Sequence, residues 1–293
     1  MRSPLSLIAA LALCLPLVAQ AATSVNERHP LGAGGRVEIS NIAGKVTVRG
    51  WDRNDVALTG SMADGLTLKQ DRSSNRVRWE VEYPRGRSNG GATLELRVPR
   101  AVEVQLGTVS ADIDVADIDV RRLQANSVSG SIIAAGRSGE TTLNTVSGGI
   151  RSQVQTPRLD ARTVSGQLLA GGGASGEVAA ESVSGRVNVT AGRIQRLAVE
   201  TVSGSLDVSA TGMAPGGKVT MQTVSGSVAL KLPVNVSAQL NVKTFSGGIQ
   251  SDAGQVEKPR YGPGSSLDAR LGSGDGDISI NSHSGSVRVS LGR

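Results

Sequence analysis

Residues Glu200–Val208 read "ETVSGSLDV", and this short stretch decides the fold of the chain. Close variants recur as "NSVSGSIIA", "NTVSGGIRS", "RTVSGQLLA", "ESVSGRVNV" and "QTVSGSVAL". A serine that recurs so often is a reactive group, a ligand-binding group or part of a building unit. The spacing of the copies distinguishes these alternatives, because a fixed internal period is the signature of a repeat architecture.

The copies are evenly spaced when they are aligned on the residue before Ser-Gly or its equivalent. The aligned positions are Val109, Val128, Val146, Val164, Val183, Val202, Val224, Phe245 and His283. The steps between them are 19, 18, 18, 19, 19, 22, 21 and 38 residues. We interpret the last step as two repeats of 19 residues in which one corner has been replaced by other sequence. An earlier relative of the corner, "SNIAGKVTV", occupies residues 40–48.

One repeat has the pattern of two short strands joined by a bend. Before the corner Leu197 and Val199 alternate with other residues, and Leu206 and Val208 do so after it. Such period-2 alternation indicates β-strands, and glycine at the corner tolerates a sharp bend. Because parallel crossovers are right-handed, the repeat predicts an all-β, right-handed parallel β-solenoid with coils of about 19 residues.

Stacked coils would place like residues on like, about 4.8 Å apart. The repeat therefore predicts a valine column, a glycine column that leaves room at the corner, and a Thr/Ser column whose hydroxyls hydrogen-bond along a ladder. In this interpretation Ser203 is one rung of that ladder. At about 19 residues per coil, residues 37–291 predict roughly 13 coils.

The chain divides into three parts on this pattern. Residues 1–21 are predicted to be a signal peptide, and residues 22–106 a less regular β region that caps or starts the solenoid. A hairpin is expected at "RSSN", residues 72–75. The repeats fill residues 107–293, interrupted by a Gly/Pro-rich loop at 251–267.

The first residues combine a charged start, an apolar run from Leu5 to Val18 and an Ala19-Gln20-Ala21 cleavage site. This pattern predicts cleavage before Ala22, with a retained anchor as the alternative. The single cysteine, Cys14, lies inside the run, so the mature chain is expected to form no disulfide and no thiolate metal site. We predict an exported protein without a transmembrane anchor, in the periplasm, on the cell surface or outside the cell.

The net charge of the whole chain is +6, and the basic side chains are spread along it. This mild excess is typical of a solvated surface, with anionic envelope polymers as a weaker interpretation. Aromatic residues make up 2% of the chain and no basic cluster occurs, which argues against nucleic-acid binding.

The order of motifs resembles a known family. A "GWDRNDV" turn is followed by "LRVPRAVEVQLGTVSADI", serial "TVSG" corners and a "GDGDISINSHSGSVRV" ending. This arrangement is similar to the bacterial putative-adhesin family of unknown function, whose members are exported β-solenoid proteins with repeated V-S-G corners. The resemblance implies an envelope or surface location and a role in adhesion or envelope stress, and it assigns no catalytic or binding residues. The chain departs from the pattern at Ala111, in place of the corner glycine, and at His283, in place of valine.

Catalysis by the recurring serine needs a base beside the hydroxyl. The two histidines are His29, near the predicted mature N-terminus, and His283, which lies between Ser282 and Ser284. A Ser–His pair at that corner is one interpretation, and a histidine that replaces valine in the column is the favoured one.

Acidic residues in two stretches raise the alternative of calcium binding. They are Asp112, Asp114, Asp117 and Asp119 in the first stretch and Asp275 and Asp277 in the second. Calcium takes six to eight converging oxygens, whereas alternating aspartates along a strand usually form a solvated face. We therefore predict no metal and no cofactor.

An enzyme that acts on polysaccharide is the alternative from another functional class. It would need a groove with two or more carboxylates within about 10 Å of each other. Trp51, Trp79 and Tyr83 are candidates for a sugar platform, although core packing of the N-terminal region is the favoured interpretation.

The residues thus favour a non-enzymatic cell-envelope β-solenoid that acts as an adhesin-like interaction or structural module. The candidate contacts for a protein or polysaccharide partner are Lys258, Arg260 and Tyr261, in the Gly/Pro-rich loop. The alternative is a β-helix enzyme that acts on envelope or extracellular polysaccharide.

Overall fold

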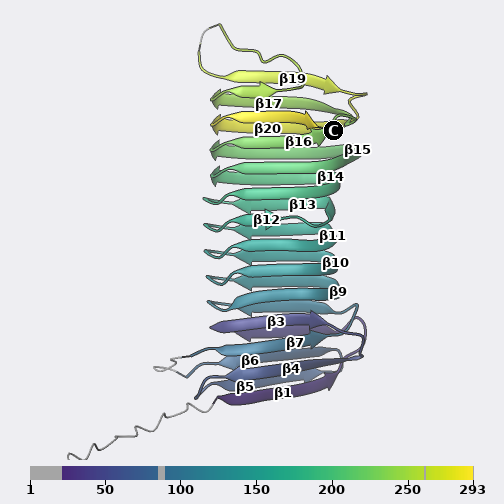
Figure 1. Cartoon of the computed structure of the whole chain (residues 1–293), viewed down its shortest axis with the longest axis vertical. Coiled ribbons are helices and arrows are strands. Elements are labelled where there is room, and N and C mark those ends of the chain that lie inside the picture. Colours follow the sequence, from purple (N-terminus) through teal and green to yellow (C-terminus); the bar gives the residue numbers. More distant parts are fainter. Residues whose placement is uncertain (1–21, 85–89, 261, 293) are drawn as a thin grey trace, which may run out of the picture.

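The computed structural model describes residues 22–84, 90–260 and 262–292, and every regular element among them is a β-strand (Figure 1). The predicted signal peptide lies outside the described residues. Within these ranges no helix has the length and apolar character that a membrane span requires. The strands are β1 (Thr23–Pro30), β2 (Arg36–Asn41), β3 (Gly44–Gly50), β4 (Asp55–Met62), β5 (Thr67–Ser73), β6 (Arg76–Glu82), β7 (Ala92–Val98), β8 (Glu103–Thr108), β9 (Asp112–Ser127), β10 (Ile132–Thr145), β11 (Ile150–Thr163), β12 (Leu168–Ala170), β13 (Ala174–Ser182), β14 (Val187–Ser203), β15 (Leu206–Ser225), β16 (Val228–Pro233), β17 (Ala238–Ser246), β18 (Ile249–Ser251), β19 (Ser265–Leu271), β20 (Gly276–Ser284) and β21 (Val287–Gly292).

The middle of the chain is a stack in which strands that follow one another in sequence pair in parallel (Figure 1). Ile132 pairs with Ile113 on one side and with Ile150 on the other. Leu206 lies between Val187 and Val228 in the same way. Like residues therefore stack on like, and the predicted all-β class is confirmed.

Aliphatic side chains fill the interior of the stack. Leu197, Val199 and Leu206, which alternate in the sequence with outward residues, are completely buried. Among the described residues, Trp79 is the one aromatic side chain that is completely buried, and it lies in the N-terminal part. Burial of many Val, Leu and Ile side chains, each contributing about 1.5–3 kcal/mol, stabilises the stack without large rings.

Among the described residues the corner hydroxyls form only one rung of the predicted ladder, where Thr108 Oγ1 donates to Ser127 Oγ of the next coil at 3.0 Å. The buried hydroxyl of Thr163 instead accepts a hydrogen bond from the Gly166 amide at 3.0 Å, within its own coil. The exposed Ser147 hydroxyl donates to the Val128 carbonyl of the neighbouring coil at 3.3 Å. Ser203 has no such side-chain bond among the described residues. The prediction of Ser203 as a ladder rung was therefore wrong. Its equivalents Ser147 and Ser165 also bond backbone carbonyls of the neighbouring coil and not the next hydroxyl.

We expect Thr163→Val to lower stability by about 1–3 kcal/mol, because the buried Gly166 amide would lose its acceptor. Thr201→Val is the matched control, since the Thr201 hydroxyl is buried without a partner among the described residues. Its removal should leave the melting temperature unchanged or raise it. Thermal unfolding followed by circular dichroism compares the two variants, and equal losses would contradict this account of the corner.

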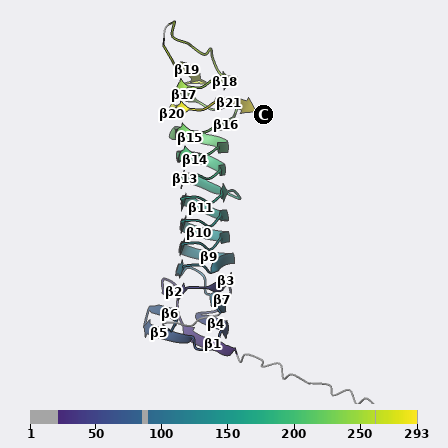
Figure 2. The ribbon, with the colours of Figure 1, turned by 90° about the vertical axis from the view of Figure 1, so that its left-hand side faces the viewer.

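The N-terminal end of the stack is interleaved, out of sequence order (Figure 2). Strand β2 pairs in parallel with β6 on one side and β8 on the other, and β3 lies likewise between β7 and β9. Strands β4 and β5 pair antiparallel with β7 and β6, and β1 pairs antiparallel with β4. The hairpin predicted at residues 72–75 is confirmed as the β5–β6 connection.

The C-terminal end is interleaved as well. Strand β20 lies between β15 and β17, and β21 lies between β16 and β18. The corners along the stack therefore run Val224, His283, Phe245. The interpretation of the 38-residue step as two consecutive coils was wrong, because the chain leaves the stack after β18, returns as the antiparallel β19 and inserts its last coil.

Candidate ligand-binding groove

The corner valines point out of the stack and form an exposed apolar column. In "ETVSG" Thr201 is buried in phase with Val199, so Val202 falls on the outer face and is 48% exposed. The same holds at the other corners with large apolar residues, which are Ile42, Val109, Val128, Val146, Val164, Val183, Val224 and Phe245. Continuing the strand alternation into the corner would have shown from the sequence that the predicted valine column faces outward.

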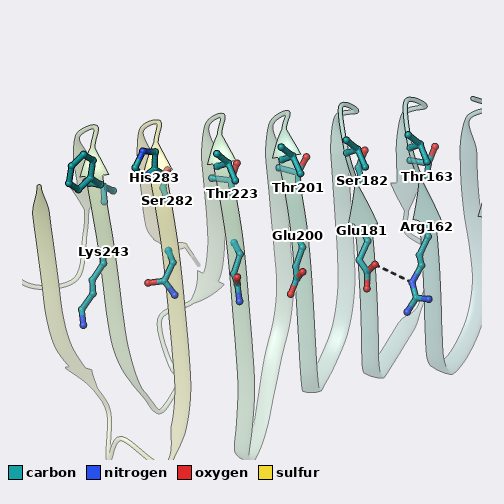
Figure 3. Close-up of a pocket in the computed structure, with 18 of the residues that line it drawn as sticks. Arg162, Thr163, Glu181, Ser182, Glu200, Thr201, Thr223, Lys243, Ser282 and His283 are labelled. Carbon is teal, nitrogen blue, oxygen red and sulfur yellow. Dashed lines mark ion pairs between the residues drawn. The ribbon is translucent and has the colours of Figure 1, made fainter. Parts of the chain in front are cut away.

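A second, polar column lies beside the valines. Side chains two residues before each corner residue share its outward face, because strand side chains alternate with period 2. Figure 3 shows Arg162, Glu181 and Glu200 along this line on successive strands. Between the two columns lies a shallow groove of about 1040 Å³ that runs across the strands from Asn144 to Lys243.

The charges of the polar column are paired at one end of the groove and unpaired at the other. Arg162 contacts Glu181 at 3.2 Å, the pair drawn in Figure 3, and Asp160 at 3.0 Å. Among the described residues the exposed side chains of Glu200, Gln222 and Lys243 have no hydrogen-bond or ion-pair partner. With respect to the described residues, the groove therefore offers a free carboxylate, a free amide and a free ammonium group.

Two stacked rings continue the apolar column at the C-terminal end of the groove. The rings of Phe245 and His283 lie 4.9 Å apart and 4° from parallel. His283 replaces valine in the column, as the favoured interpretation had it, and within the described part of the chain it makes no hydrogen bond to Ser282 or Ser284. The geometry gives no support to a Ser–His pair at this corner.

The loop residues predicted as partner contacts lie next to this end. Lys258 is exposed and lines a small cavity together with Lys243 and Thr244, which also line the groove. Arg260 belongs to the same loop, where it has an interaction partner. Tyr261 lies outside the described residues. A partner contact at these loop residues stays a prediction. The sequence predicted the valine column but not its exposure or the groove beside it.

Two of the aspartates considered as calcium ligands, Asp114 and Asp275, bind protein groups. Burial favours a raised pKa for Asp114, but hydrogen bonds from Arg49 and Lys45 outweigh it and hold the pKa below its usual range. Hydrogen bonds from Ser273 and Ser237 lower the pKa of Asp275. In the described ranges no group of three His, Cys, Asp or Glu side chains could hold a metal ion.

The aromatic residues of the N-terminal region lie away from the groove. Trp79 is core, and the Tyr83 hydroxyl donates to Asn41 Oδ1 at 2.7 Å. Trp51 is half-buried at the surface, with the guanidinium groups of three arginines within 6 Å of its ring centre. His29 is buried against Trp79. Trp51 thus differs from the favoured interpretation as core.

Comparison with known proteins places the chain in a sequence family. The model of the family described as Toastrack DUF4097 matches residues 35–290. No curated protein matches the chain.

Solved structures with similar chain traces are putative binding or adhesion proteins. A putative adhesin from Bacteroides fragilis is 7% identical, with a TM-score of 0.45 over 92% of this chain and 99% of that one. A putative lipid binding protein from Parabacteroides distasonis is 11% identical, with a TM-score of 0.46 over 91% and 96%. A putative adhesin from Parabacteroides merdae is 10% identical, with a TM-score of 0.42 over 71% and 95%.

Proposed function

The chain belongs to the Toastrack DUF4097 family, and we propose that it is a non-enzymatic, adhesin-like interaction module of the cell envelope. One observation carries the proposal. The exposed apolar column, whose side chains are about half exposed, runs along the stack and borders the groove. Contiguous exposed apolar surface bordered by polar residues is typical of an interaction site. An exported protein, in the periplasm or on the cell surface, would present this face to an envelope component.

We also infer that the stack is a right-handed solenoid with coils of about 19 residues. Pairing of Ile132 with residues 113 and 150, which are 19 and 18 positions away, supports the coil length. The right-handedness of parallel crossovers supports the hand.

A second candidate function, polysaccharide cleavage, has one observation in its favour. Glu181 and Glu200 are paired residues on adjacent parallel strands, so the groove meets the requirement of two carboxylates within about 10 Å. Against this, Glu181 is bound by Arg162 and Glu200 is exposed, whereas a general acid is usually made by burial of its carboxyl group. We therefore propose binding without cleavage.

We expect the purified protein, immobilised on beads, to capture a component of a bacterial envelope extract saturably. The double variant Val202→Ser/Val224→Ser should lose this capture, because it removes apolar surface from the groove. Val109→Ser/Val128→Ser is the matched control, since it changes the same column outside the groove. Quantified elution is the readout, and a Lys258→Ala variant tests the loop contact. Equal capture by both double variants would contradict the proposal.

A further inference from the structure

The groove repeats chemically with the period of the strands. Each coil adds one corner side chain and one outward side chain two residues earlier, and neighbouring strands lie about 4.7–4.9 Å apart. The six successive pairs are Val164 with Arg162, Val183 with Glu181, Val202 with Glu200, Val224 with Gln222, His283 with Asn281, and Phe245 with Lys243. A ligand that fits this groove along its length therefore needs an apolar face and a polar edge, and both should repeat once per coil.

The dimensions of the groove argue against a second copy of the chain as the occupant. A stable protein interface takes about 800 Å² and roughly 20–30 residues from each partner. Here the apolar surface is a single file of side chains, each about half exposed. A slender ligand matches such a column better than a protein surface does.

The polar column distinguishes among slender ligands. An acyl chain would contact the valines and leave the free groups of Glu200, Gln222 and Lys243 unused. These groups include donors and acceptors, which match hydroxyls because a hydroxyl both donates and accepts. An extended peptide repeats its side chains on one face about every 6.6–6.8 Å, so it would lose register with the coils.

We propose that the groove binds an unbranched polysaccharide of β-1,4-linked pyranose rings, laid along the stack with about one ring per coil. Such a chain advances on the order of 5 Å per ring, close to the strand spacing of about 4.8 Å. The C–H faces of the rings lie on the valine column, and their hydroxyls bond the free groups of the polar column. The proposal rests on the interaction function proposed above and specifies its ligand.

Calorimetric titration of the purified protein with chito-oligosaccharides of two to six rings tests the register. We expect the affinity to rise at least tenfold from two rings to six, because each added ring reaches another coil. Cellohexaose should also bind, whereas maltohexaose, whose α-linked chain curves, should bind at least tenfold more weakly. Absence of binding by both β-linked hexasaccharides, no length dependence, or equal binding of maltohexaose would overturn the proposal. So would palmitate that binds in place of the sugar.

Variants locate the ligand on the protein. Val202→Ser/Val224→Ser and, independently, Glu200→Gln/Gln222→Ala should each weaken chitohexaose binding at least tenfold. Val109→Ser/Val128→Ser should bind as the unsubstituted protein does, and circular dichroism checks that all three fold. Unchanged binding in both groove variants overturns the site.

Three readouts separate failure of the ligand class from failure of the function. Groove-dependent capture of an envelope component without hexasaccharide binding overturns the polysaccharide proposal and leaves the interaction function standing. Light scattering that shows a dimer dependent on Val202 and Val224 also overturns it, in favour of a second copy. Mass spectrometry that finds shortened hexasaccharide, lost in Glu200→Gln, supports the ligand class and overturns the non-enzymatic function.

Discussion

Deleting residues 276–293 is expected to unfold the C-terminal end of the stack, although the repeats before it stay intact in sequence. The deletion removes β20 and β21, which pair on both edges with β15, β16, β17 and β18. Four completely or almost completely buried side chains go with them, Ile278, Ile280, Val287 and Val289. At about 1.5–3 kcal/mol each their loss amounts to roughly 6–12 kcal/mol, comparable to the whole stability of many domains.

Hydrogen exchange and limited proteolysis measure this effect along the chain. Protection should vanish in β17, β18 and β19, which would lose their connection to the stack, and persist in β10 and β11. A peptide of residues 276–292 added in trans should restore part of the protection, because an inserted strand is held by main-chain bonds on both sides. Replacing residues 258–263 with a Gly/Ser linker is the control. A deletion variant that melts within a few degrees of the full chain would show that the last coil is not inserted.

The interleaving behind this prediction could not be read from the repeat. The corners are nearly identical, so a coil can stack on almost any other coil with valine on valine and glycine on glycine. The period therefore predicted the strands, the bends and the parallel register, but not the order of the coils. The 38-residue step resembled two repeats because the excursion through β19 happens to have that length.

The groove was missed for a related physical reason. The sequence offered residues outside the repeat pattern, such as His283 and the loop around Lys258, as site candidates. The groove is instead built mainly from the consensus, because repetition aligns Val183, Val202 and Val224 into one surface. The phase of the buried Thr201 was the available signal. The sequence could not show that Glu200 and Lys243 lack a partner among the described residues. That depends on which side chains the stacking of coils brings beside them.

The glycine column is where a single added carbon should have its largest effect. A Cβ built on Gly148 would lie 2.1 Å from the Gly130 carbonyl oxygen, a backbone atom of the next coil. Contacts below about 3 Å force something to shift, and here the obstacle is the paired backbone itself. Relieving this clash would separate two coils that are hydrogen-bonded along their strands. At position 111 this column holds alanine in place of glycine. The Ala111 amide bonds the carbonyl of Ile42, which belongs to the irregular corner of the N-terminal region.

We therefore expect Gly148→Ala to destabilise the protein by about 3 kcal/mol or more, above the usual cost of an alanine substitution. The adjacent Gly149→Ala is the matched control, because a Cβ there would meet its nearest atom, the Gln167 carbonyl oxygen, at an ordinary 3.6 Å. Thermal unfolding should show a melting temperature about 6–12 °C lower for Gly148→Ala and little change for Gly149→Ala. Similar small shifts in both variants would mean that the coils at this corner are not in backbone contact.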